Sequence, residues 1–154
     1  MQIGITAMGA YLPALRVDRK AIAREYSWSG LGMPRGGFRA LAGWDEDSLT
    51  MAVEAARGLV RTAPESLRIA STSAYYTERS QSAIALDALA LPRTVRTVDF
   101  GNSRRAATTA MLDALLGTGD QIVVASEKRL TQAGSAAQLA YGDGAAAVRI
   151  GEGG

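Results

Sequence analysis

The segment DFGNSRRAATTAM, residues 99–111, decides the fold. It follows a short β-branched run at residues 94–98 and leads through a tight turn into an alanine-rich helix expected over residues 102–116. A helix that begins at the end of a strand can hold an anion or a reactive side chain at its positively charged N-terminus. The segment predicts either a site at the mouth of a sheet or an ordinary strand-to-helix connection whose alanines permit close packing.

Four further runs of apolar or β-branched residues predict the remaining strands, and three amphipathic segments predict helices between them. The strands are expected at residues 3–12, 67–72, 121–126 and 145–150, and the helices at residues 18–26, 45–61 and 79–90. This alternation indicates an α/β fold with a mostly parallel sheet and helices on both faces. We expect a single domain over residues 1–154, with a loop at residues 27–43, where glycines cluster around a proline.

The composition limits the chemistry that is open to the chain. It is 47% hydrophobic and 21% charged, which is typical of a globular domain. The lack of cysteine excludes disulfides and thiolate metal sites and makes a cytoplasmic location the default. The lack of histidine means that a Ser-His-Asp triad, a Cys-His pair or a common zinc hydrolase site cannot be completed within the chain. We therefore expect no metal site.

The sequence indicates neither a membrane nor a nucleic acid as a partner. No apolar run approaches the roughly 20 residues that cross a bilayer, so we expect no membrane segment. The net charge is only +2, and no basic run or interleaved set of aromatic residues marks a nucleic-acid surface. A small acidic ligand, such as a CoA phosphate, stays open.

Four segments of the chain, taken in order, resemble hydroxymethylglutaryl-CoA synthases and type III ketoacyl-ACP synthases, which share the thiolase fold. In those families the segment after the third strand reads like Asp-x-x-(Asn/Ala)-Ala-Cys-x-(Gly/Ala)-Gly-Thr. Four residues of this chain match that pattern, namely Asp99, Asn102, Ala106 and Thr108. The other similar segments are GAYLP at residues 9–13, DEDSLTMA at residues 45–52 and YGDGAAAV at residues 141–148. The resemblance implies the N-terminal half of a thiolase-like fold, with a five-stranded, mostly parallel sheet and an antiparallel last strand.

The resemblance also implies where a catalytic site would lie, and there the chain departs from the family. The cysteine that forms the acyl-enzyme falls on Arg104, whose guanidinium has no nucleophilic lone pair at neutral pH. Its neighbour Ser103 is an alternative nucleophile that lacks a base. The catalytic glutamate falls near Ser73, and Glu78, five residues on, could replace it only after a loop rearrangement. Arg105 is a candidate for binding the CoA thioester, with no covalently bound cofactor expected.

Three features keep two interpretations each. Arg104 and Arg105 form either a cationic patch for a carboxylate or phosphate, or a salt bridge to a partner or in solvent. Asp143, between two glycines, is either a turn residue or a cation ligand. Tyr75 and Tyr76 either line a pocket or pack within a loop.

In the family, a second half of the fold supplies the catalytic histidine and asparagine, and the helix at residues 102–116 lies between the two halves. We therefore expect a partner, which is a second half in another chain or a second copy of this chain. The expected function is one half of an acyltransferase that acts on acyl-CoA thioesters by Claisen-type or retro-aldol carbon–carbon chemistry. The alternative is an inactive thiolase-like scaffold that stabilises a partner.

Overall fold

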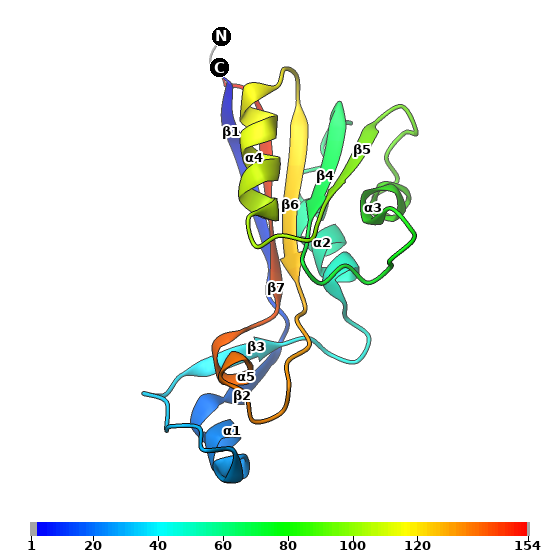
Figure 1. Ribbon diagram of the computed structural model, residues 1–154. Helices are drawn as coiled ribbons and strands as arrows, with labels where there is room; N and C mark the ends of the chain where they lie inside the picture. Colours follow the sequence, from blue (N-terminus) through cyan, green and yellow to red (C-terminus); the bar gives the residue numbers. More distant parts are fainter. Residues whose placement is uncertain (1–2, 154) are drawn as a thin grey trace.

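The computed structural model describes residues 3–153, and its main feature is a five-stranded sheet in the order β1-β7-β6-β4-β5 (Figure 1). Strands β4 and β6 pair in parallel, as do β4 and β5, whereas β7 is antiparallel to both of its neighbours. Four strands therefore point one way and the last strand points the other way, which confirms the prediction. The strands are β1 (Ile3–Tyr11), β4 (Ser66–Ala70), β5 (Arg96–Phe100), β6 (Gln121–Glu127) and β7 (Gly144–Glu152).

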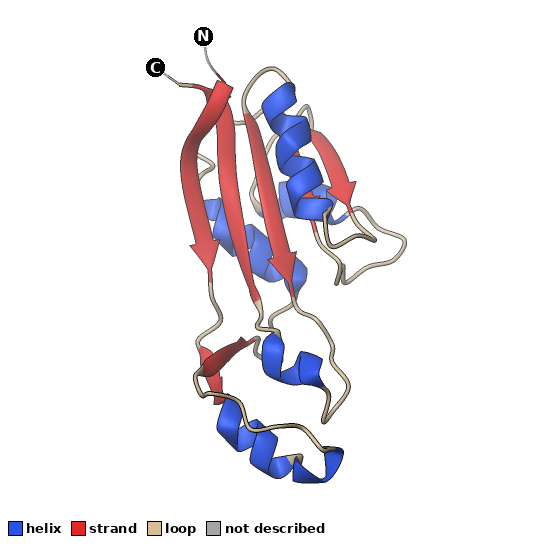
Figure 2. Cartoon of the chain, turned by 60° about the vertical axis from the view of Figure 1, so that its left-hand side comes forward, coloured by secondary structure: helices blue, strands red, loops and turns tan. Residues whose placement is uncertain are grey.

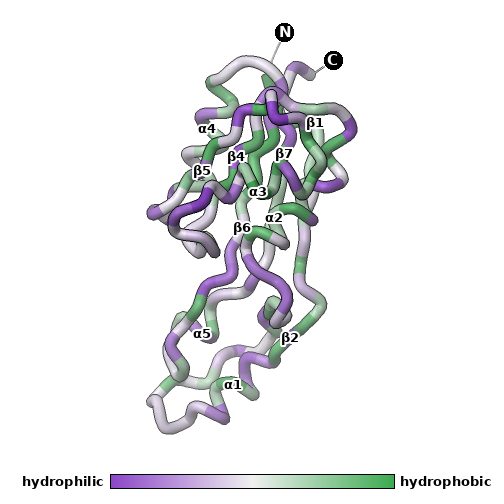
Figure 3. Tube along the Cα trace, turned by 90° about the vertical axis from the view of Figure 1, so that its right-hand side faces the viewer, coloured by the Kyte–Doolittle hydropathy of each residue, from purple (hydrophilic) through white to green (hydrophobic). Residues whose placement is uncertain are grey.

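Helices cover both faces of this sheet, as Figure 2 shows. One face packs against α2 (Ser48–Arg57) and α3 (Gln81–Ala88), and the other packs against α4 (Ala106–Leu116). Successive side chains of a strand point to opposite faces. Accordingly, Ile122 and Val124 of β6 join the core under α2, and Val123 joins the core under α4. Figure 3 shows hydrophobic residues, in green, along the strands of this sheet.

A smaller layer lies at one end of the sheet. It consists of a two-stranded antiparallel ribbon, β2 (Leu15–Asp18) with β3 (Phe38–Leu41), flanked by α1 (Arg19–Glu25) and α5 (Ala136–Ala140). The predicted loop at residues 27–43 is wrong in part, because a 3-10 helix (Ser27–Ser29) and β3 lie within it. The backbone groups of β3 find their hydrogen-bond partners in β2, and the glycine-rich composition of this segment gave no sign of that pairing.

Two helix boundaries also differ from the prediction. Helix α4 begins at Ala106 instead of residue 102, because Asn102 has φ +60° and a right-handed helix does not admit that conformation. Helix α2 extends from Ser48 to Arg57 instead of over residues 45–61. The carboxylate of Asp47 caps its start by accepting the N–H of Thr50 at 2.7 Å. Across residues 3–153, none of the helices is long and apolar enough to span a membrane.

Candidate functional site

Three hydrogen bonds hold the carboxylate of Glu127, at the carboxyl end of β6. The Thr72 backbone N–H donates to its Oε1 at 2.8 Å, and the Thr72 hydroxyl donates to Oε2 at 2.9 Å. The Ser73 hydroxyl also donates to Oε2, at 2.8 Å. Thr72 and Ser73 follow β4, which is the parallel neighbour of β6, so two adjacent strand ends hold one half-buried carboxylate. The carboxyl edge of a parallel sheet is where α/β proteins place their ligands.

Ser73 is fixed from several sides, which suits a residue that orients another group. Its hydroxyl oxygen accepts the backbone N–H of Lys128 at 2.8 Å, and its carbonyl accepts the Ser48 hydroxyl at 2.8 Å. Its own N–H donates to the Ser71 hydroxyl oxygen at 3.0 Å. At the predicted position of the catalytic glutamate, this chain therefore has a serine that donates to a carboxylate from the next strand.

Two cavities adjoin this network. The larger one, of about 820 Å³, is lined by residues 44–48, 72–75 and 128–130. Glu127 lines a second cavity, of about 430 Å³, together with Asp143 and the glycines on either side of it. Tyr75 lines the larger cavity and also packs edge-on against Tyr76, with 5.0 Å between ring centroids. The pocket interpretation therefore fits Tyr75 alone, and the packing interpretation fits both residues. Glu127 thus borders a space that could hold a small acyl group.

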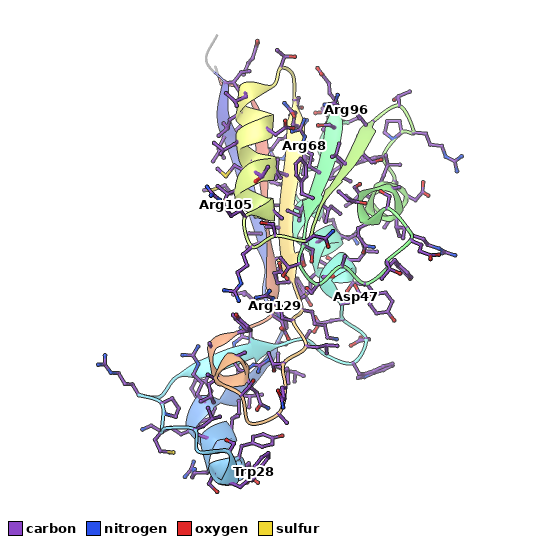
Figure 4. The ribbon with its side chains drawn as sticks, viewed as in Figure 1. Trp28, Asp47, Arg68, Arg96, Arg105 and Arg129 are labelled. Atoms are coloured by element: carbon purple, nitrogen blue, oxygen red, sulfur yellow. The ribbon has the colours of Figure 1, made fainter. Side chains whose placement is uncertain are left out.

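The loop at residues 43–47 is fixed as one wall of the larger cavity. The Tyr11 hydroxyl donates to Glu46, which lowers the pKa of that carboxyl, and the same contact raises the pKa of Tyr11. The other Glu46 oxygen accepts the Gly43 N–H at 2.6 Å. The ammonium of Lys128 donates to the carbonyls of Gly43 and Glu46. Figure 4 places Asp47 of this wall and Arg129 near the junction of the two sheets.

The predicted residues after β5 lie on the surface. Arg104 extends towards Tyr141, with 3.4 Å between its Nη2 and the tyrosine hydroxyl, and Arg129 lies over the same ring at 4.8 Å from its centroid. The Ser103 hydroxyl accepts the backbone N–H of Arg105 at 3.1 Å, which occupies it within the turn. The Arg105 side chain makes no capping hydrogen bond to α4, and Figure 4 shows it at the N-terminal end of that helix.

The remaining candidates lie apart from the Glu127 network. Glu78 is in the exposed loop before α3, and no hydrogen bond or ion pair joins it to Ser73 or Glu127 within residues 3–153. Asp143 accepts the N–H of Ala42 at 2.8 Å, which ties the glycine turn to the segment after β3 and favours the turn interpretation. The described part of the chain contains no group of three or more potential metal ligands.

Sequence reasoning missed Glu127, Arg129 and Tyr141. A signal for Glu127 existed, since it directly follows the buried run at residues 121–126, and parallel strands bring their carboxyl ends together. The sequence offered no comparable signal for the other two residues, because α5 lies between them and their meeting depends on its path.

Comparison with known proteins finds similar sequences among hydroxymethylglutaryl-CoA synthases, although no family model matches the chain. It is 32% identical to the hydroxymethylglutaryl-CoA synthase of Aeropyrum pernix over 164 aligned residues, which cover 96% of the chain and 45% of that protein. It is 28% identical to the enzyme of the same name from Thermococcus onnurineus, with coverage of 97% and 45%. The chain thus spans about half the length of the curated relatives it matches.

Solved structures of the same kind share the fold. The HMG synthase of the curacin biosynthetic pathway, in complex with an acetyl donor-ACP, superimposes with a TM-score of 0.83 at 21% identity, over 98% of this chain and 41% of that one. The 3-oxoacyl-(acyl carrier protein) synthase III of Pseudomonas aeruginosa has a TM-score of 0.83 at 17% identity, over 100% and 51% of the two chains. The chain is therefore a thiolase-like half of the hydroxymethylglutaryl-CoA synthase type, similar to the N-terminal half of those enzymes.

Proposed function

We propose that this chain is one half of an acyl-CoA-dependent enzyme whose site is completed by another chain, and that it makes or breaks carbon–carbon bonds next to a thioester. The observation that carries the proposal is the oriented carboxylate of Glu127, which lines a cavity at the carboxyl edge of a sheet. The similarity to hydroxymethylglutaryl-CoA synthases along 96% of the chain supports the same class of chemistry.

Retro-aldol cleavage is the form of this chemistry that fits a chain without cysteine, because it needs no acyl-enzyme. A base removes the proton of the 3-hydroxyl group of a 3-hydroxyacyl thioester, and the C2–C3 bond breaks as the C3 carbonyl forms. The bonding electrons move onto the thioester as an enolate, which is then protonated at C2. Glu127 is our candidate for the base, since Thr72 and Ser73 fix its orientation and a carboxylate can accept that proton. Arg104 takes no covalent part.

A second chain is supported by the outer surface of α4. Leu112 and Leu116 of this helix are 53% and 86% exposed, while its alanines pack on the sheet. Exposed apolar side chains on one helix face are typical of a surface that another protein covers. In the proposed assembly, this face packs against the second half or against another copy of the chain.

The test is to supply 3-hydroxyacyl-CoA thioesters to the chain together with whatever co-purifies with it, and to follow shorter acyl-CoA and carbonyl products by mass spectrometry. We expect turnover that falls at least about 100-fold in Glu127→Gln, because the amide cannot accept the proton. Glu54→Gln, on the exposed side of α2, is the matched control and should retain the rate. A covalent acyl adduct on any residue would contradict the retro-aldol route.

The lack of cysteine and histidine in this chain favours a second candidate, a non-catalytic scaffold that stabilises a thiolase-like partner. Turnover by the assembly distinguishes the enzyme from the scaffold. Turnover by the unmodified assembly supports the enzyme. Absence of turnover in the assembly, both unmodified and with Arg104→Cys, supports the scaffold.

A further inference from the structure

Three segments that are separate in the sequence bring two guanidinium groups to one tyrosine. Arg104 follows β5, Arg129 follows β6 and Tyr141 precedes β7. Arg104 contacts the hydroxyl of Tyr141 at 3.4 Å, and Arg129 lies over its ring at 4.8 Å from the centroid. We call these three residues the arginine–tyrosine cluster. The cluster borders the larger cavity, because Arg129 is also one of the residues that line it.

The positive charge of this cluster has no internal counterion. Within residues 3–153, the ion pairs between side chains involve Arg57, Arg68 and Arg149, and neither Arg104 nor Arg129 has a carboxylate within ion-pair distance. Two like charges directed at one ring repel each other. An anion bound between them would replace that repulsion with attraction, so the arrangement is better suited to a bound state than to a free one.

The donors of the cluster remain available to such an anion. A phenol oxygen that accepts a hydrogen bond still has its own proton to donate, so Tyr141 can pass a hydrogen bond onward from Arg104. A guanidinium that stacks on an aromatic ring keeps its in-plane N–H groups free. The cluster therefore offers two guanidinium groups and one hydroxyl, a set of donors that matches the two oxygens of a carboxylate.

We propose that the arginine–tyrosine cluster binds a carboxylate at the far end of the acyl group of an acyl-CoA thioester. This assignment rests on the proposed function, because that function brings the acyl group to the carboxyl edge of the sheet, which both cavities adjoin. A phosphate of CoA has the same general chemistry. It carries more negative charge, and Asp45, Glu46 and Asp47 line the same cavity as Arg129, which disfavours a phosphate there more than a singly charged carboxylate. The singly charged carboxylate is the better match.

The experiment compares two CoA thioesters of similar acyl shape by isothermal titration of the chain in its purified form, with any chain that accompanies it. Succinyl-CoA ends in a carboxylate, whereas butyryl-CoA ends in a methyl group. We expect succinyl-CoA to bind about tenfold more tightly, as one or two charge-assisted hydrogen bonds provide. Arg104→Gln and Arg129→Gln should each remove most of this preference and leave the affinity for butyryl-CoA unchanged. Arg93→Gln, on the exposed loop before β5, removes the same charge elsewhere and should keep the preference.

Each other result overturns a defined part of the reasoning. Equal affinity for the two thioesters refutes the carboxylate site and leaves the proposed function standing. Weaker binding of both thioesters in Arg104→Gln and Arg129→Gln assigns the cluster to a CoA phosphate, which also refutes it. Failure of both thioesters to bind removes the proposed function, and the carboxylate site with it. Tyr141→Phe keeps the ring under Arg129 and should lower the preference only in part.

Discussion

Gly9 on β1 is a position at which adding a single methyl group should have a large effect on folding. A Cβ atom built there would lie 2.3 Å from the carbonyl oxygen of Ala55 in α2 and 3.6 Å from Cγ of Leu59. Since Cβ atoms essentially never approach other atoms closer than 3.0 Å, the strand and the helix would have to separate by about 0.7 Å. Overpacking a rigid interface in this way costs about 3 kcal/mol. We therefore expect Gly9→Ala to destabilise the chain by that amount.

The assay is urea denaturation followed by circular dichroism. With a slope of about 2 kcal/mol per molar urea, the midpoint of Gly9→Ala should fall by about 1.5 M. Gly4→Ala is the matched control, because Gly4 lies on the same strand and a Cβ atom there would meet nothing within 4 Å. Its midpoint should stay within about 0.25 M of the wild type, an effect of about 0.5 kcal/mol. Equal midpoints for the two variants would refute the close packing of α2 on β1.

Three further predictions concern polar contacts. Asp113→Ala should destabilise the chain by about 2 kcal/mol in urea denaturation, because Arg68, which is 2% exposed, loses a carboxylate partner that is itself 59% exposed. Tyr11→Phe should flatten the acid limb of a plot of melting temperature against pH. The Tyr11 hydroxyl lowers the pKa of Glu46 in the folded chain. The hydrogen bond therefore contributes fully to the free energy of unfolding above the unfolded pKa of about 4.3, and this contribution is lost as pH falls through the lower pKa of the folded state. Glu127→Ala should lower stability by about 2 kcal/mol in urea denaturation, because three donors lose their acceptor at a half-buried position.

Controls for these variants come from exposed positions of the same chain. Glu54→Ala breaks an ion pair with Arg57 whose side chains are 45% and 57% exposed, so it should change stability by less than about 0.5 kcal/mol. An effect of Asp113→Ala no larger than that would show that the ion pair of Arg68 is unimportant. An unchanged acid limb in Tyr11→Phe would exclude the hydroxyl as the cause of the lowered Glu46 pKa. Full stability of Glu127→Ala would mean that water satisfies its three donors.

The five-stranded sheet was predictable because its strands carry strong local signals. The run of apolar residues at the start of β6, for example, is buried on both faces. Outside this sheet, the cap of α1 was also predicted, and Asp18 accepts the Lys20 N–H at 2.9 Å. The smaller layer was not predictable in the same way. Strands β2 and β3 have four residues each and become strands only by pairing with one another, and α5 has five residues. Elements of that length contain too few residues to show a periodic pattern.

The candidate site was predicted only where the sequence resembles a family. That resemblance indicated Ser73 as the residue in the position of the catalytic glutamate, and the structure places Ser73 next to a carboxylate. It could not indicate Glu127, because the partner comes from a strand about fifty residues further along the chain and the contact arises from the pairing of β4 with β6. The meeting of Arg104 with Tyr141 is likewise a tertiary contact, between residues 37 positions apart.

The central claim is that this chain binds acyl-CoA thioesters at the carboxyl edge of its sheet. The most direct test is ¹H–¹⁵N NMR of the ¹⁵N-labelled 16.1 kDa chain, together with any chain that co-purifies with it, during titration with acetyl-CoA. We predict saturable shifts of the backbone amides of Thr72, Ser73 and Lys128, with none at Thr6 and Thr62, which line a different cavity. Shifts concentrated at Thr6 and Thr62, or no shifts at millimolar acetyl-CoA, would contradict the claim.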